Sequence, residues 1–217
     1  MMDLRSLLRT LAICRPLFHS EADFQHAFAW ELHRQFPEGT IRLELPMNSA
    51  LGLLHVDVTA QLEGRAHAFE LKYKTRATVA CVGSEVYALQ DHGAQPLGRY
   101  DFLKDVARLE SVAEALSGLA ACAILLTNDS AYWSAPRSGD DTSAAFSLSD
   151  GRSLSGHLDW SPETSPGTKR KREAPIDLKG KYVLRWQDYS DIGSRYCARF
   201  RFIAIEVRPV SATAKQP

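Results

Sequence analysis

The stretch that most constrains this chain runs from His55 to Lys74, HVDVTAQLEGRAHAFELKYK. Apolar and polar residues alternate on both sides of the dipeptide Glu63-Gly64, which is typical of two β-strands joined by a two-residue turn. With such a turn, Leu62 pairs with Arg65 and the two strands run antiparallel. The pattern therefore predicts a hairpin whose register is set by its turn.

That register has a consequence for the charged residues. Paired residue numbers have a constant sum in an antiparallel pair, so we expect Asp57 opposite Glu70. By the same count, His55 lies opposite Lys72. Side-chain alternation then separates two faces. The charged face carries Asp57, Glu70, Lys72 and Lys74, and the core face carries Val56, Val58, Phe69, Leu71 and Tyr73.

Two carboxylates placed directly opposite each other destabilise a strand pair, which favours a cation between Asp57 and Glu70. Mg²⁺ prefers oxygen ligands, usually one or two carboxylates with water and phosphate. Lys72 would then orient or deprotonate a bound water, or neutralise developing charge. A three-residue turn would move Glu70 to the other face and remove the site. The simpler alternative is a solvated strand face with weak ion pairs.

Composition limits the partners of the chain. The 217 residues include 26 basic and 26 acidic ones, with a pI near 7.1, so a nucleic-acid partner would be bound by local rather than global charge. Its four cysteines form no Cys-x-x-Cys pair, and the N-terminus lacks the features of a signal peptide or membrane span. We therefore expect a reduced, cytoplasmic protein that contacts no membrane.

Periodicity predicts the remaining elements. An amphipathic helix ends before Pro16, and a second one follows Ser20, which has an acid three residues later as in a helix N-cap. TIRLELPM reads as a strand, residues 83–98 as irregular, 99–116 as a long helix and AACAILLTND as a buried strand. Strand, helix and strand in this order predict a right-handed crossover.

The late part of the chain changes in composition. Residues 134–180 are rich in Ser, Pro, Gly and charge, which predicts a loop-rich, flexible insertion. KYVLRW and ARFRFIAIEVRPV then predict two more strands. We expect one α/β domain with a mixed central sheet flanked by helices, its core spanning about residues 17–133 and 181–209.

The order of these parts resembles the PD-(D/E)xK nuclease superfamily, which has the restriction-endonuclease-like fold. The resemblance covers roughly residues 20–130: the helix from Glu21, Asp57 in LLHVDVTA, Glu70-Leu71-Lys72, the helix from Arg99 and the strand CAILLTND. Val56 stands where the proline of the family motif would precede the Asp. The motifs are short, so their specificity comes from their order and setting.

The resemblance implies roles for particular residues. Asp57, Glu70 and the Leu71 carbonyl would bind Mg²⁺, with Mn²⁺ as a substitute, and Lys72 would assist the attacking water. Many such nucleases add an acid from the first helix, for which Glu21 and Glu31 are candidates. Glu21 is favoured because an acid also suits the helix N-terminus, although that is equally a purely structural reason for it. Glu31 is instead expected to face solvent from the helix.

Substrate contacts are expected beside this site. The candidates are Lys74, Gln95, Arg99, Lys104 and Arg108. A solvated helix face, with Asp101, Asp105 and Glu110 moderating the charge, is the alternative. The densest basic run is KRKR, Lys169 to Arg172, which would grip phosphates or simply belong to a surface loop.

The function implied is a Mg²⁺-dependent nuclease, a hydrolase that cleaves phosphodiester bonds, most plausibly in DNA. The rival hypothesis is a catalytically inactive nucleic-acid-binding or assembly protein that retains the fold. A homodimer is compatible with either hypothesis.

Overall fold

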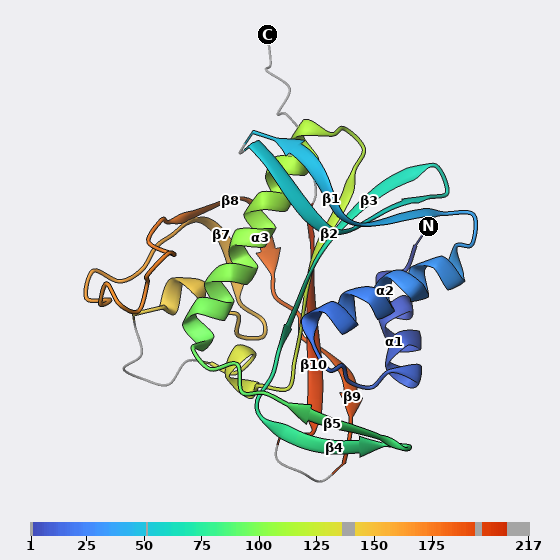
Figure 1. Ribbon diagram of the computed structural model, residues 1–217. Helices are drawn as coiled ribbons and strands as arrows, with labels where there is room; N and C mark the ends of the chain where they lie inside the picture. The colour runs from blue at the N-terminus through green and yellow to red at the C-terminus, as the bar shows by residue number, and fades with distance from the viewer. Residues whose placement is uncertain (1, 51, 136–141, 194–196, 208–217) are drawn as a thin grey trace.

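The computed structural model describes residues 2–50, 52–135, 142–193 and 197–207 (Figure 1). A six-stranded sheet runs through its centre in the order β1-β2-β3-β6-β10-β9. The strands are β1 (Thr40–Ser49), β2 (Gly52–Leu62), β3 (Arg65–Lys74), β6 (Ala120–Thr127), β9 (Gln187–Asp191) and β10 (Arg199–Val207). β3 and β6 are parallel and the other neighbours antiparallel, so the sheet is mixed, as expected.

Helices cover both faces of this sheet. α1 (Leu4–Cys14) and α2 (Glu21–Gln35) pack on one face, in a cluster that includes Phe24, Phe28 and Leu71. α3 (Gln95–Ala115) packs on the other face. The Ser20 side chain accepts a hydrogen bond from the Asp23 amide, which confirms the predicted N-cap. None of the described helices is long and apolar enough to cross a membrane.

The predicted hairpin is confirmed as β2 and β3. Glu63 and Gly64 have φ values of 48° and 79°, and positive φ at both central residues is the signature of a type I′ turn. Leu62 pairs with Arg65, and the ladder continues in the same register to Val58 and Phe69. The turn therefore fixes which side chains of the two strands face each other.

Two small hairpins complete the described structure. β4 (Thr78–Val82) pairs with β5 (Glu85–Leu89), and β7 (Ser153–Leu158) pairs with β8 (Ile176–Val183). Short 3₁₀ turns, η1 (Ser130–Tyr132) and η2 (Ala144–Phe146), precede β7. The expectation of irregular structure over residues 83–98 was wrong for β5, where Tyr87 and Leu89 are buried, and for the first turn of α3, which begins at Gln95.

The late segment is more ordered than its composition predicted. The predicted ranges 134–180 and 181–209 include positions 136–141, 194–196 and 208–209, which lie outside the described residues. Within the described part, Phe146, Leu154, Trp160 and Ile176 are buried against α3 in its cluster. The loop-rich expectation failed because these widely spaced apolar residues have no local periodicity. Of KYVLRW, only residues 181–183 are in a strand, β8, which belongs to the small β7–β8 sheet rather than the central one.

Candidate functional site

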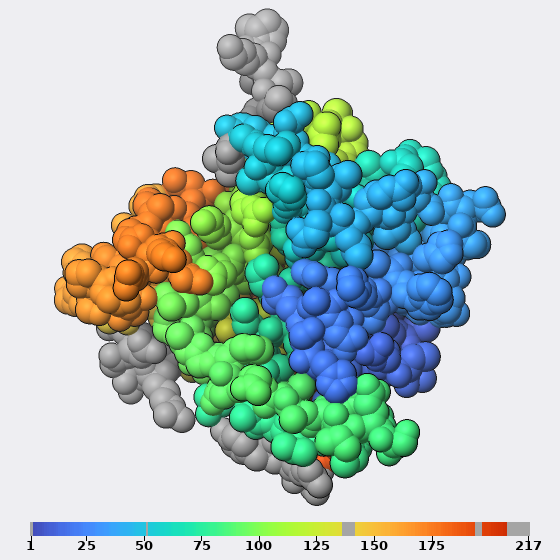
Figure 2. Space-filling view, viewed as in Figure 1, coloured from blue at the N-terminus to red at the C-terminus, as the bar shows by residue number. Residues whose placement is uncertain are grey.

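The candidate site forms where β2 separates from β3. Pairing between the two strands stops at Val58 and Phe69, whereas β3 keeps its pairing with β6 as far as Lys74 and Thr127. One edge of β3 is therefore open from Glu70 onward. Figure 2 shows the surface hollowed between α2 (blue) and α3 (green), with atoms of β3 (teal) at the bottom.

Two predicted acids occupy this open edge. Asp57 Oδ2 accepts a hydrogen bond from the Leu71 amide at 2.7 Å, and Glu21 Oε2 accepts one from the Tyr73 amide at 2.9 Å. Because the N–H and C=O of one strand residue point to the same side, the Leu71 carbonyl also faces this edge. The carboxylates thus satisfy amides that β2 would have paired, had it continued beside β3.

The register prediction is confirmed, but the pairing stops one step short of the acids. Asp57 and Glu70 are the first residues beyond the last pair, and Asp57 bonds to Leu71 instead of facing Glu70 in the ladder. His55 does not pair with Lys72, since it lies in the part of β2 that pairs only with β1, opposite Pro46.

The separation of β2 from β3 also shows that one prediction about the core face was wrong. Val56 packs in the α3 cluster and Val58 in the α2 cluster, although alternation predicted one face for both. Leu45 of β1 pairs with Val56, while the preceding Glu44 has a φ of 52°. Simple alternation fails here because the backbone is irregular where β2 leaves β3.

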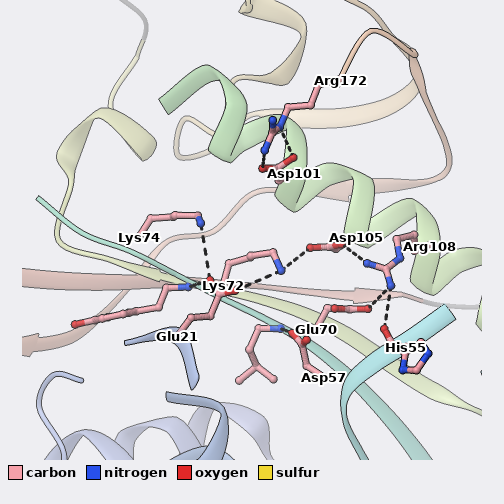
Figure 3. A network of polar contacts seen from close by, with 12 residues as sticks. Glu21, His55, Asp57, Glu70, Lys72, Lys74, Asp101, Asp105, Arg108 and Arg172 are labelled. Carbon is pink, nitrogen blue, oxygen red and sulfur yellow. Dashed lines mark hydrogen bonds and ion pairs between the residues drawn. The ribbon is translucent and has the colours of Figure 1, made fainter. Parts of the chain in front are cut away.

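Basic side chains surround the acids (Figure 3). Lys72 Nζ lies 3.0 Å from Asp105 Oδ2 and 3.7 Å from Glu21 Oε1, and Lys74 Nζ lies 3.9 Å from Glu21 Oε2. Glu21, Lys72 and Lys74 are therefore brought together as predicted. The first-helix acid at the site is Glu21.

Arg108 of α3 completes the network. One guanidinium nitrogen lies 2.8 Å from Asp105 Oδ1, and the other lies 3.5 Å from Glu70 Oε1 and donates to the His55 carbonyl at 2.9 Å. Four carboxylates thus face three cations. The carboxylates are Glu21, Asp57, Glu70 and Asp105, and the cations are Lys72, Lys74 and Arg108.

Burial and neighbouring charges shift the pKa values of two of these groups. The pKa of Glu70 is raised to about 9, first by burial and then by the carboxylates of Asp105 and Asp57, against the opposing charge of Arg108. Burial alone would lower the pKa of Lys72, but the neighbouring carboxylates, led by Asp105, outweigh it and raise that pKa. Lys72 is consequently a cation at neutral pH, whereas the raised pKa of Glu70 favours its protonated form.

The other predicted residues lie elsewhere or have structural partners. Gln95 Nε2 donates to Asp129 Oδ2 at 2.8 Å. Arg99 is buried, and its guanidinium donates to the Ala131 carbonyl at 2.6 Å. Lys104 is exposed on α3. Glu31 is buried on α2 and hydrogen-bonds Arg34 at 2.7 and 2.8 Å, so the expectation that it faces solvent was wrong.

Asp105 is the functional candidate that the sequence reasoning missed, since it was grouped with acids that moderate surface charge. It is only 5% exposed and contacts both Lys72 and Arg108. A signal was present in the helical spacing, because Asp105 lies three residues after Phe102 and four before Leu109, both of them core residues.

The donor set fits a hard divalent cation in kind. Asp57 and Glu70 supply carboxylate oxygens, and Leu71 has a carbonyl on the same open edge. The described part of the chain contains no group of three or more His, Cys, Asp or Glu side chains arranged to hold one ion. A metal here would therefore need water or substrate oxygens to complete its coordination. It would also have to displace the proton of Glu70 and compete with Arg108 for that side chain.

The chain matches no protein-family model, no curated protein and no solved structure. The function is therefore inferred from the geometry of the site.

Proposed function

We propose that the protein is a Mg²⁺-dependent nuclease with a restriction-endonuclease-like fold, which hydrolyses phosphodiester bonds, with DNA as the favoured substrate. The observation that carries the proposal is the open edge of β3. There Asp57, Glu70 and Lys72 meet at the end of the β2–β3 ladder, in a half-buried hollow. Acids and a lysine in this order resemble the catalytic motif of the PD-(D/E)xK superfamily.

In this proposal Asp57, Glu70 and the Leu71 carbonyl hold the ion, which when bound supplies charge stabilisation and an acidified water. Lys72 is held as a cation by Asp105 and Glu21, so it stabilises negative charge on the phosphate rather than removing a proton. Glu21 holds β3 by accepting the hydrogen bond from the Tyr73 amide. Glu21 also neutralises Lys74 until a substrate phosphate takes the place of its carboxylate.

The test is cleavage of linear and circular DNA by purified protein in Mg²⁺ or EDTA. Lys72→Ala is expected to lower the rate by on the order of 10²–10³-fold, the usual cost of removing one charge-stabilising donor. Lys181→Ala, which removes an exposed lysine of β8, serves as the control and should leave the rate unchanged. Undiminished Mg²⁺-dependent cleavage by Lys72→Ala would reject the catalytic role.

A specific observation favours the second candidate, a non-catalytic nucleic-acid-binding or assembly protein. Glu70 and Asp105, the two buried acids of the site, already have basic partners from the chain itself. Calorimetric titration with Mn²⁺ or Mg²⁺ separates the two candidates. A nuclease should bind the ion and lose that binding in Asp57→Ala, whereas a protein that binds DNA with no metal affinity and no cleavage would favour the second candidate.

A further inference from the structure

The basic run Lys169–Arg172 is not part of the site described above. It lies in the connection between β7 and β8, where the described residues form a series of turns. Figure 2 shows this segment (orange) beside α3 (green), with the hollow of the candidate site along the other side of the helix. The run therefore borders the same helix that contributes Asp105 and Arg108.

Several contacts fix this run on α3. Arg172 makes a two-point ion pair with Asp101 at 2.6 and 2.7 Å (Figure 3). The indole of Trp160 donates to the Arg172 carbonyl at 2.7 Å, and the Tyr100 hydroxyl donates to the Ala174 carbonyl at 2.8 Å. Trp160 and Tyr100 are themselves buried and stacked, with ring centroids 5.7 Å apart. The backbone of the run is thus attached to a rigid aromatic base.

The cations of the run face solvent. Arg170 and Lys171 are exposed and Lys169 is half-buried, and none of the three forms an ion pair within the described residues. Arg172 alone is committed to an acid, Asp101. One cation of the run thus anchors it, and the other three lie beside α3. Glu173 accepts a hydrogen bond from the Lys171 amide at 2.8 Å and interacts electrostatically with Lys169 and Arg170, so one carboxylate offsets part of their charge.

The run and the candidate site are connected along one stripe of the helix. Asp101, Asp105 and Arg108 follow one another at intervals of four and three residues, so they share a face of α3. Lys104 is exposed on the same turn of α3 as Asp101. It therefore adds an exposed cation to α3 near the anchor of the run.

We propose that Lys169, Arg170 and Lys171 form a second phosphate-binding element, which holds the backbone of a nucleic-acid duplex farther along α3 from the site. This inference rests on the proposed function for the identity of the partner. Asp101, which anchors the run, precedes Asp105 by four residues, a rise of about 6 Å along the helix axis. At 3.4 Å of rise per base pair, this axial offset corresponds to about two base pairs of backbone between the element and the phosphate at Lys72.

The experiment is duplex binding, measured by fluorescence anisotropy on a 20-base-pair DNA in EDTA, over a series of salt concentrations. The variant is Lys169→Gln/Arg170→Gln/Lys171→Asn, in which Asn is chosen because Lys171 has a φ of 67° and Asn tolerates that conformation. The control, Arg5→Gln/Lys181→Gln/Arg185→Gln, removes three cations that line a separate surface hollow of about 580 Å³. Melting temperatures of both variants verify folding.

The variant should bind at least tenfold more weakly than wild type at 0.1 M salt, with a salt slope smaller by about 2–3. The control should match wild type. Equal binding by the variant, an equal loss in both variants, or no duplex binding by wild type would each overturn the inference. Mg²⁺-dependent cleavage is scored separately, so the phosphate element can stand where the nuclease proposal fails, and the reverse.

Discussion

Glu70 is the residue whose protonation connects the chemistry of the site with the stability of the protein. Its pKa is about 9 in the folded chain, against 4.5 for an unperturbed glutamate. Between these values the folded state binds more protons than the unfolded state, so stability is fully present at low pH and is lost as the pH rises toward 9. The loss is at most about 1.4 kcal/mol per pH unit.

Glu70→Gln removes this dependence, because the amide is never charged. In EDTA, the melting temperature of wild type should fall from pH 6 to pH 9, and that of the variant should fall less and lie several degrees higher at pH 8. Glu31→Gln is the matched control. Glu31 is equally buried, but its pKa is lowered by the hydrogen bond from Arg34, so its loss should destabilise the protein at neutral pH. Parallel pH profiles for wild type and Glu70→Gln would contradict the expectation.

At the level of elements, α3 determines where Asp105 and Arg108 lie, and its position depends on one close contact. A Cβ at Gly98 would lie 2.1 Å from the hydroxyl oxygen of Tyr132, so the helix approaches η1 only because this residue is glycine. Gly→Ala inside a helix normally stabilises by about 1 kcal/mol. Here the steric overlap should reverse the sign.

Gly98→Ala is therefore expected to destabilise the protein by about 1–3 kcal/mol, measured by urea unfolding. The double variant Gly98→Ala/Tyr132→Phe should recover much of that loss, because it removes the atom that is hit first. Tyr132→Phe alone should cost little, since the buried hydroxyl has no hydrogen-bond partner within the described residues. A Gly98→Ala protein that is more stable than wild type would contradict this expectation.

At the level of the whole molecule, the β7–β8 region and the central sheet share one core. Trp160 and Ile176 of the late segment lie in the same cluster as Leu125 and Ile203 of the sheet, with α3 between them. Because these side chains are buried against α3, the late segment cannot unfold alone without exposing that face of α3 to water. The two parts should unfold as a single unit.

Tryptophan fluorescence and far-UV circular dichroism are accordingly expected to give coincident urea transitions. Trp160→Ala should lower the unfolding free energy by about 3–5 kcal/mol. Trp30→Ala, which truncates a side chain that is 72% exposed, should change it by less than about 0.5 kcal/mol. Two separate transitions would mean that the late segment is an independent unit.

Local sequence patterns were sufficient for the features that depend on neighbours in the chain. Alternation and the turn residues determined the β2–β3 register, and Ser20 marked the start of α2, because these signals act over two to four residues. They also brought Asp57 and Lys72 into one hypothesis, to which the family resemblance added Glu21. The burial of Arg99 and the hairpin β7–β8 escaped prediction, since both depend on packing against residues more than 30 positions away.

The amino-acid pattern was enough to place acids and a lysine near one another on two adjacent strands, because a two-residue turn at Glu63-Gly64 and the two-residue period of a strand define the register. How these side chains are used depends on tertiary packing. β2 separates from β3 after Val58, which frees the edge where Asp57 and Glu21 bind main-chain amides. α3 then supplies Asp105 and Arg108 from 35 residues beyond Glu70, and the packing of that helix, which no local pattern encodes, sets the charge of Lys72 and Glu70.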